Sequence, residues 1–116
     1  MRKIFGHRGL PQIYIENTIK SLNKALEICD FVETDIRITK DEQLIFYHDP
    51  TIENKKIEEL TLSEIKTFID IDISEIHFVS RDQIKGRANF ELKVNKEESE
   101  LNKIFINKVT NLTKQD

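Results

Sequence analysis

The sequence is poor in cysteine, has no long apolar run and carries no excess of basic charge, and each shortage excludes a class of protein. Cys29 is the single cysteine, so it has no partner for an intrachain disulfide or a thiolate zinc site, and we expect a small core side chain. No apolar run approaches the roughly 20 residues that span a bilayer. The first residues also lack the apolar stretch of a secretory signal. We therefore expect a cytoplasmic protein without a membrane span.

The charge balance argues against a nucleic-acid partner. The 18 basic and 21 acidic side chains give a formal net charge of -3, with no basic stripe to neutralise a phosphate backbone. The length of 116 residues suits one domain, which we place at residues 1–116. A hydrophobic share of 38% is enough for a modest core, so we expect the chain to fold.

The apolar pattern predicts alternating strands and helices. Short apolar or alternating runs predict strands at residues 3–6, 31–38 and 89–94. Helical periodicity follows each of them, at residues 19–29, 61–68 and 97–112, with Asn17 or Thr18 as the first N-cap and a Thr61–Glu64 capping box for the second. This order predicts an α/β fold with a parallel sheet.

Three segments between these elements have weaker patterns. Residues 44–48 are rich in strand formers and follow a turn signal, so we expect them to return along the second strand as a short hairpin. Residues 51–60 are polar, which indicates a loop. Residues 69–86 lose any period, and strand, loop and short helix remain open there.

Ionisable residues stand at the end of each predicted strand, where a core strand would be apolar. They form three pairs: His7 and Arg8, Glu33 and Asp35, and Glu91 and Lys93. Because functional groups of parallel sheets collect at the carboxyl ends of the strands, we expect these pairs to meet. Buried carboxylates need a compensating cation, and three of them without a thiolate suit Mg²⁺ or Ca²⁺ better than zinc. We therefore expect Glu33, Asp35 and Glu91 to be metal ligands.

The hairpin predicts where His48 lies. If Asp41 and Glu42 are the two residues of the turn, Asp35 lies directly opposite His48, and opposed residues share a face of the sheet. His48 would then lie beside the carboxylates and near His7, and two imidazoles can act as general acid and general base.

Two cations complete the predicted constellation. Arg8 and Lys93 can neutralise an anionic substrate, and the planar guanidinium of Arg8 matches the geometry of a phosphate. The combination indicates metal-assisted cleavage of a phosphodiester, because it contains carboxylates for a hard metal, two histidines and two cations.

Structural interpretations compete with each of these assignments. A histidine after a strand is more often structural than catalytic, and we keep His77 in that class. Glu33 and Asp35 could form the exposed face of an edge strand, and Glu91 and Lys93 a surface ion pair of little consequence. The agreement of successive strand ends favours the functional interpretation.

Several strings of the sequence resemble one family. GHRG, IENT, ALEICDFVETDIRITKDEQLIFYHDP, TLSEIKTF and NFELKV are similar, in order and spacing, to the amino-terminal half of the glycerophosphodiester phosphodiesterases. That family has the pattern HRG, PENT, E-x-D-V-x-x-T-K-D-G, HD and E-x-K, and the resemblance covers residues 2 to about 95. It implies a (β/α)₈-type barrel that hydrolyses glycerophosphodiesters to an alcohol and glycerol 3-phosphate with a divalent cation.

By position, the resemblance implies roles for the same residues. They would be a catalytic pair, two phosphate-binding side chains and three metal ligands: His7 and His48; Arg8 and Lys93; Glu33, Asp35 and Glu91. It also implies that Glu16 and Asn17 brace the loop after His7.

The chain departs from the family pattern in composition and in length. Ile15 stands where the family has proline, and Glu42 stands where it has the glycine of the turn. A closed barrel of this type needs at least about 200 residues, so we expect a truncated, partial (β/α) barrel of about three βα units. Its open edges would favour self-association.

The sequence is also compatible with other functions. The chain could be an inactive remnant, or an interaction module that a partner chain completes. Phospholipase D-like toxins share a plan of two histidines and acidic metal ligands, but the lack of a secretory signal and of further cysteines argues against them.

Overall fold

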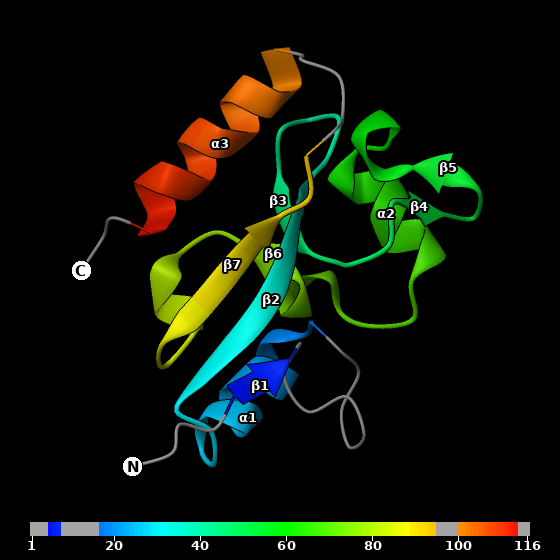
Figure 1. Ribbon diagram of the computed structural model, residues 1–116. Helices are drawn as coiled ribbons and strands as arrows, with labels where there is room; N and C mark the ends of the chain where they lie inside the picture. The colour runs from blue at the N-terminus through cyan, green and yellow to red at the C-terminus, as the bar shows by residue number, and fades with distance from the viewer. Residues whose placement is uncertain (1–4, 8–16, 95–99, 114–116) are drawn as a thin grey trace.

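The computed structural model describes residues 17–94 and 100–113, together with the backbone of residues 5–7 (Figure 1). The strands are β1 (Phe5–His7), β2 (Phe31–Ile38), β3 (Leu44–Phe46), β4 (Thr51–Ile52), β5 (Lys55–Lys56), β6 (His77–Phe78) and β7 (Ala88–Leu92). The α-helices are α1 (Ile19–Leu26), α2 (Leu62–Phe68) and α3 (Glu100–Thr113). Short 3₁₀ helices are η1 (Ile57–Glu59), η2 (Ile73–Glu75) and η3 (Arg81–Gln83). Within the described ranges, no helix is both long and apolar enough to cross a bilayer.

Strand β2 is the centre of the main sheet. It pairs in parallel with β1 and with β7, and antiparallel with β3, which in turn pairs with β6. Val32 pairs with β1 and β7 at once, and Ile36 with β3 and β7 at once. Strands β1 and β3 therefore lie along one edge of β2, and β7 lies along the other. The expected parallel sheet and the hairpin after the second strand are confirmed.

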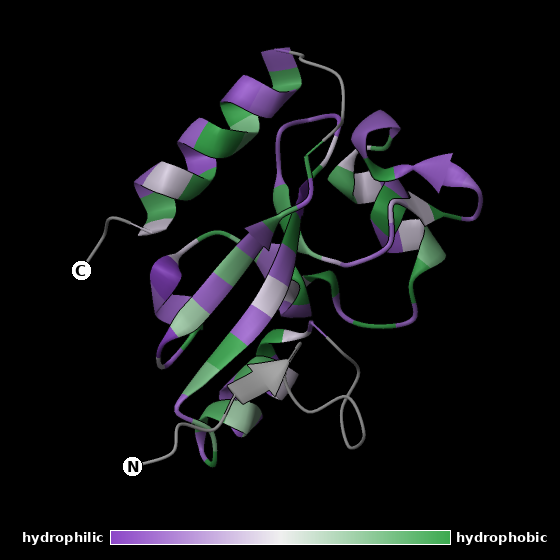
Figure 2. Ribbon diagram, in the orientation of Figure 1, coloured by the Kyte–Doolittle hydropathy of each residue, from purple (hydrophilic) through white to green (hydrophobic). Residues whose placement is uncertain are grey.

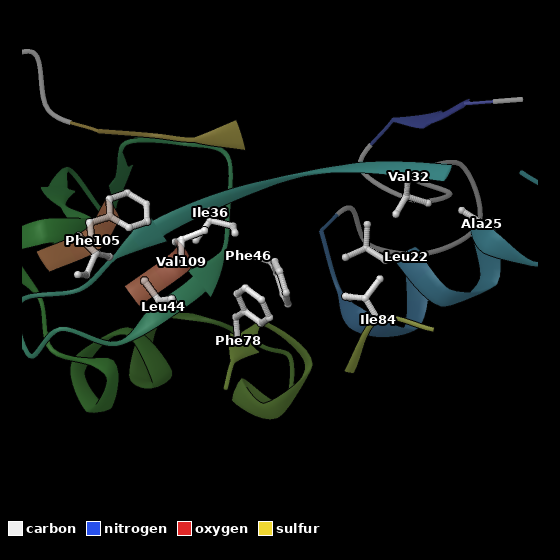
Figure 3. Close-up of a cluster of buried hydrophobic side chains, with 11 residues drawn as sticks. Leu22, Ala25, Val32, Ile36, Leu44, Phe46, Phe78, Ile84, Phe105 and Val109 are labelled. Carbon is white, nitrogen blue, oxygen red and sulfur yellow. The ribbon is translucent and has the colours of Figure 1, made fainter. Parts of the chain in front are cut away.

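Helices α1 and α3 lie on one face of the parallel strands. The main core joins buried side chains of α1, β2 and α3, among them Leu22, Ala25, Val32, Ile36, Phe105 and Val109 (Figure 3). The parallel strands β1, β2 and β7 lie in the sheet in the same order as in the chain. A doubly wound sheet has helices on both faces, whereas sequential strands with helices on one face are the winding of a (β/α) barrel. The described strands form an open segment of such a barrel, as the sequence predicts.

A second core lies on the other side of β3. Its buried members are Ile45, Ile52, Ile57, Leu60, Ile65 and Ile76. Leu44 and Phe46 face the main core, whereas Ile45, between them, faces the second core. In Figure 1 the helix α2 and the hairpin of β4 and β5 gather on this side, away from α3.

The predicted starts of the first two helices are confirmed by their caps. Thr18 Oγ1 accepts from Ser21 N at 3.1 Å at the start of α1. Thr61 and Glu64 exchange side-chain and backbone hydrogen bonds at the start of α2, as a capping box does. The hydrogen bond from the Thr61 backbone lowers the pKa of the Glu64 carboxyl. Helix α1 ends before Cys29, whose side chain is half-buried against the main core. Residues 97–99 of the predicted third helix lie outside the described residues.

Two segments contain more structure than the sequence indicates. Residues 51–56, expected as a polar loop, form the β4–β5 hairpin, whose turn residues Glu53 and Asn54 have φ values of 50° and 64°. Two consecutive left-handed residues are typical of a type I′ hairpin turn. The segment 69–86 contains η2, β6 and η3, so all three open alternatives contribute to it.

The predicted register of the β2–β3 hairpin is wrong by one residue. Ile36 pairs with Phe46, and Tyr47 N donates to Asp35 O at 3.0 Å, so Tyr47 lies opposite Asp35 in place of His48. The turn has three residues between Thr39 and Gln43, and Thr39 N donates to Gln43 O at 2.9 Å. Glu42 is left-handed, with φ 63°, which closes this longer turn.

Candidate functional site

The face of β2 opposite the main core is polar. Glu33, Asp35 and Arg37 alternate along the strand with other buried residues, of which Val32, Ile36 and Ile38 belong to the main core. Hydrophilic and hydrophobic residues alternate along both β2 and β7 (Figure 2). The edge-strand interpretation of Glu33 and Asp35 is wrong, because β2 is paired on both edges and Asp35 is 0% exposed.

Three carboxylates meet on this face. Asp35 pairs in register with Glu91 of β7, and Glu33 precedes Asp35 by two residues on the same face. Glu33, Asp35 and Glu91 each offer an oxygen atom within 4.8 Å of the others. Ca²⁺ binds oxygen ligands at about 2.3–2.6 Å, so two oxygens on one ion can lie up to about 5 Å apart. The donor set therefore fits a hard divalent cation.

The Lys93 ammonium compensates part of this negative charge. Its Nζ donates to Glu91 Oε1 at 2.8 Å and lies 3.7 Å from Asp35 Oδ1. The hydrogen bond from Lys93 lowers the pKa of Glu91, although partial burial opposes the shift. The expected surface pair of Glu91 and Lys93 exists, but it is not isolated, because the same ammonium faces the buried Asp35.

A buried amide holds the second oxygen of Asp35. Asn17 Nδ2 donates to Asp35 Oδ2 at 3.0 Å, and Thr34 Oγ1 donates to Asn17 Oδ1 at 2.9 Å. Asn17 is 2% exposed and Asp35 N lies 3.4 Å from its Oδ1. The family resemblance gives Asn17 a role in bracing the loop after His7, whereas the described contacts of its side chain are with β2. Glu16 lies outside the described residues.

His48 lies just beyond β3 and is fixed by two contacts. Its Nδ1 is 3.0 Å from Asp49 Oδ1, and its side chain is 34% exposed. Its carbonyl oxygen accepts from Arg37 Nε at 3.0 Å and from Arg37 Nη2 at 2.6 Å. Arg37 is 8% exposed and was not among the predicted site residues, although it shares the strand face of Glu33 and Asp35. That shared face is the signal that could have identified it.

The remaining predicted site residues are placed only in part. The backbone of β1 pairs His7 in register with Glu33. Arg8 lies outside the described residues. His77 Nε2 is 3.0 Å from Gln43 Oε1, and burial lowers the pKa of this imidazole despite the opposing field of Asp41. These contacts join His77 to the hairpin and fit the structural role expected for it.

Comparison with known proteins identifies the family. The sequence model of the glycerophosphoryl diester phosphodiesterase family matches residues 7–110. The chain belongs to this family. Among the glycerophosphodiester phosphodiesterases, that of Caldanaerobacter subterraneus is 35% identical over 69 residues, which are 54% of this chain and 28% of that protein. Human lysophospholipase D GDPD1 is 31% identical over 96 residues, covering 77% of this chain and 30% of the human one.

The solved structures of glycerophosphodiester phosphodiesterases support the fold. The crystal structure of one from Parabacteroides distasonis aligns with a TM-score of 0.77 at 28% identity, over 97% of this chain and 51% of that one. The chain thus spans less than a third of the two curated relatives and about half of the solved structure. The alignment agrees with the open barrel segment described above.

Proposed function

We propose that the chain carries out metal-dependent hydrolysis of glycerophosphodiesters to an alcohol and glycerol 3-phosphate, a reaction of glycerophospholipid metabolism. The observation that supports it most is the convergence of Glu33, Asp35 and Glu91 within 4.8 Å on the polar face of the sheet. The family match over residues 7–110 supplies the substrate class.

In this proposal Glu33, Asp35 and Glu91 hold Mg²⁺ or Ca²⁺, both of which prefer carboxylate oxygens. When bound, the ion would neutralise charge that develops on the phosphoryl oxygens. Lys93 extends from the same face, next to Glu91, and would share the binding of the phosphate with Arg8. The charges of these groups complement a phosphodiester monoanion held at the edge of the carboxylate cluster.

His7 and His48 are the proposed acid–base pair. One of them would deprotonate the attacking group, which is water or the neighbouring glycerol hydroxyl, and the other would protonate the leaving alkoxide. Asp49 Oδ1 lies 3.0 Å from His48 Nδ1, so we assign the Nδ1 proton to that contact. Nε2 of His48 is then the nitrogen left to exchange a proton with substrate.

The open edge of β7 favours a second candidate function. Within the described residues β7 pairs with β2 alone, so its other edge presents backbone donors and acceptors. A chain that uses this edge to join a partner, without turnover of its own, would be an interaction module or an inactive remnant of the family.

Turnover separates the two candidates. We expect the purified chain to hydrolyse glycerophosphocholine with Ca²⁺ or Mg²⁺ and to lose this activity in EDTA. His48→Ala should abolish it, whereas His77→Ala, which changes the histidine outside the site, should leave it intact. Absence of metal-dependent product, or equal rates in wild type and His48→Ala, would reject the enzymatic proposal.

A further inference from the structure

The amide of Asn17 has one orientation that satisfies its neighbours. Its Oδ1 accepts from the Thr34 hydroxyl at 2.9 Å and faces the backbone N–H of Asp35 at 3.4 Å. A flipped amide would place its NH₂ group against the backbone N–H of Asp35 and its oxygen against the Asp35 carboxylate. These two groups of Asp35 therefore fix the orientation of the amide, in which the nitrogen donates to Oδ2 at 3.0 Å. The Thr34 hydroxyl holds the same orientation by donating to Oδ1.

The backbone of Asn17 adds to this constraint. Asn17 has φ 60°, a left-handed conformation that glycine and asparagine adopt more readily than other residues. The next residue, Thr18, is the N-cap of α1, and its carbonyl accepts from Leu22 N at 2.9 Å. The start of α1 thus holds the amide in place over β2, where Asn17 is 2% exposed.

We propose that Asn17, held by a hydrogen bond from Thr34, is a positioning residue that presents Asp35 to a divalent cation. This inference rests on the proposed function. By holding Oδ2, the amide leaves Oδ1 facing the Lys93 ammonium, 3.7 Å away, which also lies 2.8 Å from Glu91 Oε1. A neutral donor stabilises the carboxylate without reducing the charge available to the ion. Hydrogen bonds of this kind commonly change metal affinity about 10–100-fold.

Two substitutions remove different hydrogen bonds of the Thr34–Asn17–Asp35 chain. Asn17→Gly removes the amide and keeps a residue that tolerates φ 60°. Asn54→Gly is its matched control, because Asn54 has φ 64° in the exposed β4–β5 turn. Thr34→Val removes only the hydroxyl that donates to the Asn17 amide, and Thr34→Ser keeps a hydroxyl in the same place.

The test is a calorimetric titration of the full 116-residue chain with CaCl₂ and with MgCl₂ after treatment with chelator. We expect Asn17→Gly to raise Kd for the ion about 10–100-fold. Thr34→Val should raise it about fivefold, as the loss of one hydrogen bond does. Thr34→Ser and Asn54→Gly should bind as wild type does. Circular dichroism should show the same helix content in all variants.

The outcomes separate this inference from the proposed function. Equal ion affinity in wild type, Asn17→Gly and Thr34→Val overturns the positioning role and leaves the metal site standing. If wild type itself binds neither ion, both the positioning role and the metal-dependent function are rejected. If Asn17→Gly does not fold, Thr34→Val and its Thr34→Ser control decide the question.

Discussion

Asp35 is the residue of the site at which burial and negative charge oppose each other most strongly. Its side chain is 1% exposed and lies between two further carboxylates. A buried carboxylate is stable only with hydrogen bonds or cations beside it. Asn17 and Lys93 supply these on two different oxygens, at 3.0 Å and 3.7 Å. Changes of charge next to Asp35 should therefore have large effects on stability.

Removal of the Lys93 charge should destabilise the folded chain, and added Ca²⁺ should restore the lost stability. Lys93→Met leaves the three carboxylates without this ammonium, and we expect unfolding to become easier by about 1–2 kcal/mol, since the pair is partly screened by solvent. Millimolar Ca²⁺ should recover most of the loss. Chemical denaturation with and without Ca²⁺ measures both effects. A deficit that Ca²⁺ does not change would contradict a cation site at these carboxylates.

Arg37 should matter through the backbone of His48. Its guanidinium donates twice to the His48 carbonyl, at 3.0 Å and 2.6 Å, from a position that is 8% exposed. Hydrogen bonds to charged groups contribute about 1.5–3 kcal/mol, so Arg37→Ala should lower the free energy of unfolding by about 2 kcal/mol. The exposed Arg87→Ala should change it by less than about 0.5 kcal/mol. Equal effects of the two substitutions in urea denaturation would show that the Arg37 contacts contribute little.

At the scale of elements, the β2–β3 hairpin is tied to α2 through Asp41. Asp41 Oδ1 accepts from Thr39 Oγ1 and from Leu62 N. Partial burial would raise the pKa of this carboxyl, but the hydrogen bonds from Thr39 and Leu62 outweigh it, and the pKa lies below the ordinary value of 3.8. The folded state therefore favours the ionised form.

This lowered pKa predicts that the contribution of Asp41 to the free energy of unfolding depends on pH. Asp41 stabilises the fold at pH values above its unfolded pKa, and the contribution is lost as pH falls through the lower folded pKa. Asp41→Asn should thus cost about 0.5–1 kcal/mol at pH 7, since the group is largely exposed, and progressively less toward pH 2–3. Asp70→Asn, on an exposed side chain, is the control. A deficit for Asp41→Asn that is constant with pH would contradict the assignment.

The predictable parts of the elements are those set by local sequence. The Thr18 and Thr61 caps and the alternation of β2 follow from short-range patterns, and all three are confirmed. The hairpin register failed because it depends on the left-handed Glu42, and a side chain at that position gives little sign of a longer turn.

The roles of Asn17 and Arg37 depend on contacts across long stretches of chain. Asn17 and Asp35 are 18 residues apart, and Arg37 and His48 are 11 apart. Such contacts follow from the packing of α1 and β3 against β2, which no local pattern specifies. The carboxylate set was predictable from two simple rules. Glu33 and Asp35 are two residues apart and so share a face of β2, and Glu91 lies beside Asp35 on the neighbouring parallel strand.

At the scale of the whole molecule, the open edge of β7 should determine association. A groove beside this edge is lined by Ala88, Asn89, Phe90, Leu92, Val109, Thr110 and Thr113. We expect a second copy to cover it, so the chain should form dimers as concentration rises. Thr110→Lys should shift the equilibrium to monomer, whereas Asn107→Lys, on an exposed position of α3, should not. Light scattering after size exclusion measures both, and a monomer at all concentrations would contradict the expectation.

In the proposed function, the carboxylates of β2 and β7 hold the cation on which phosphodiester hydrolysis depends. The most direct measurement is the rate of glycerol 3-phosphate release from glycerophosphocholine as free Ca²⁺ is varied in a chelator buffer, for wild type, Glu91→Gln and the exposed Glu27→Gln. We predict saturable activation by Ca²⁺ in wild type and Glu27→Gln, with activity in Glu91→Gln reduced at least about tenfold. Release that is independent of Ca²⁺, or equal in all three proteins, would show that these carboxylates do not hold a catalytic cation.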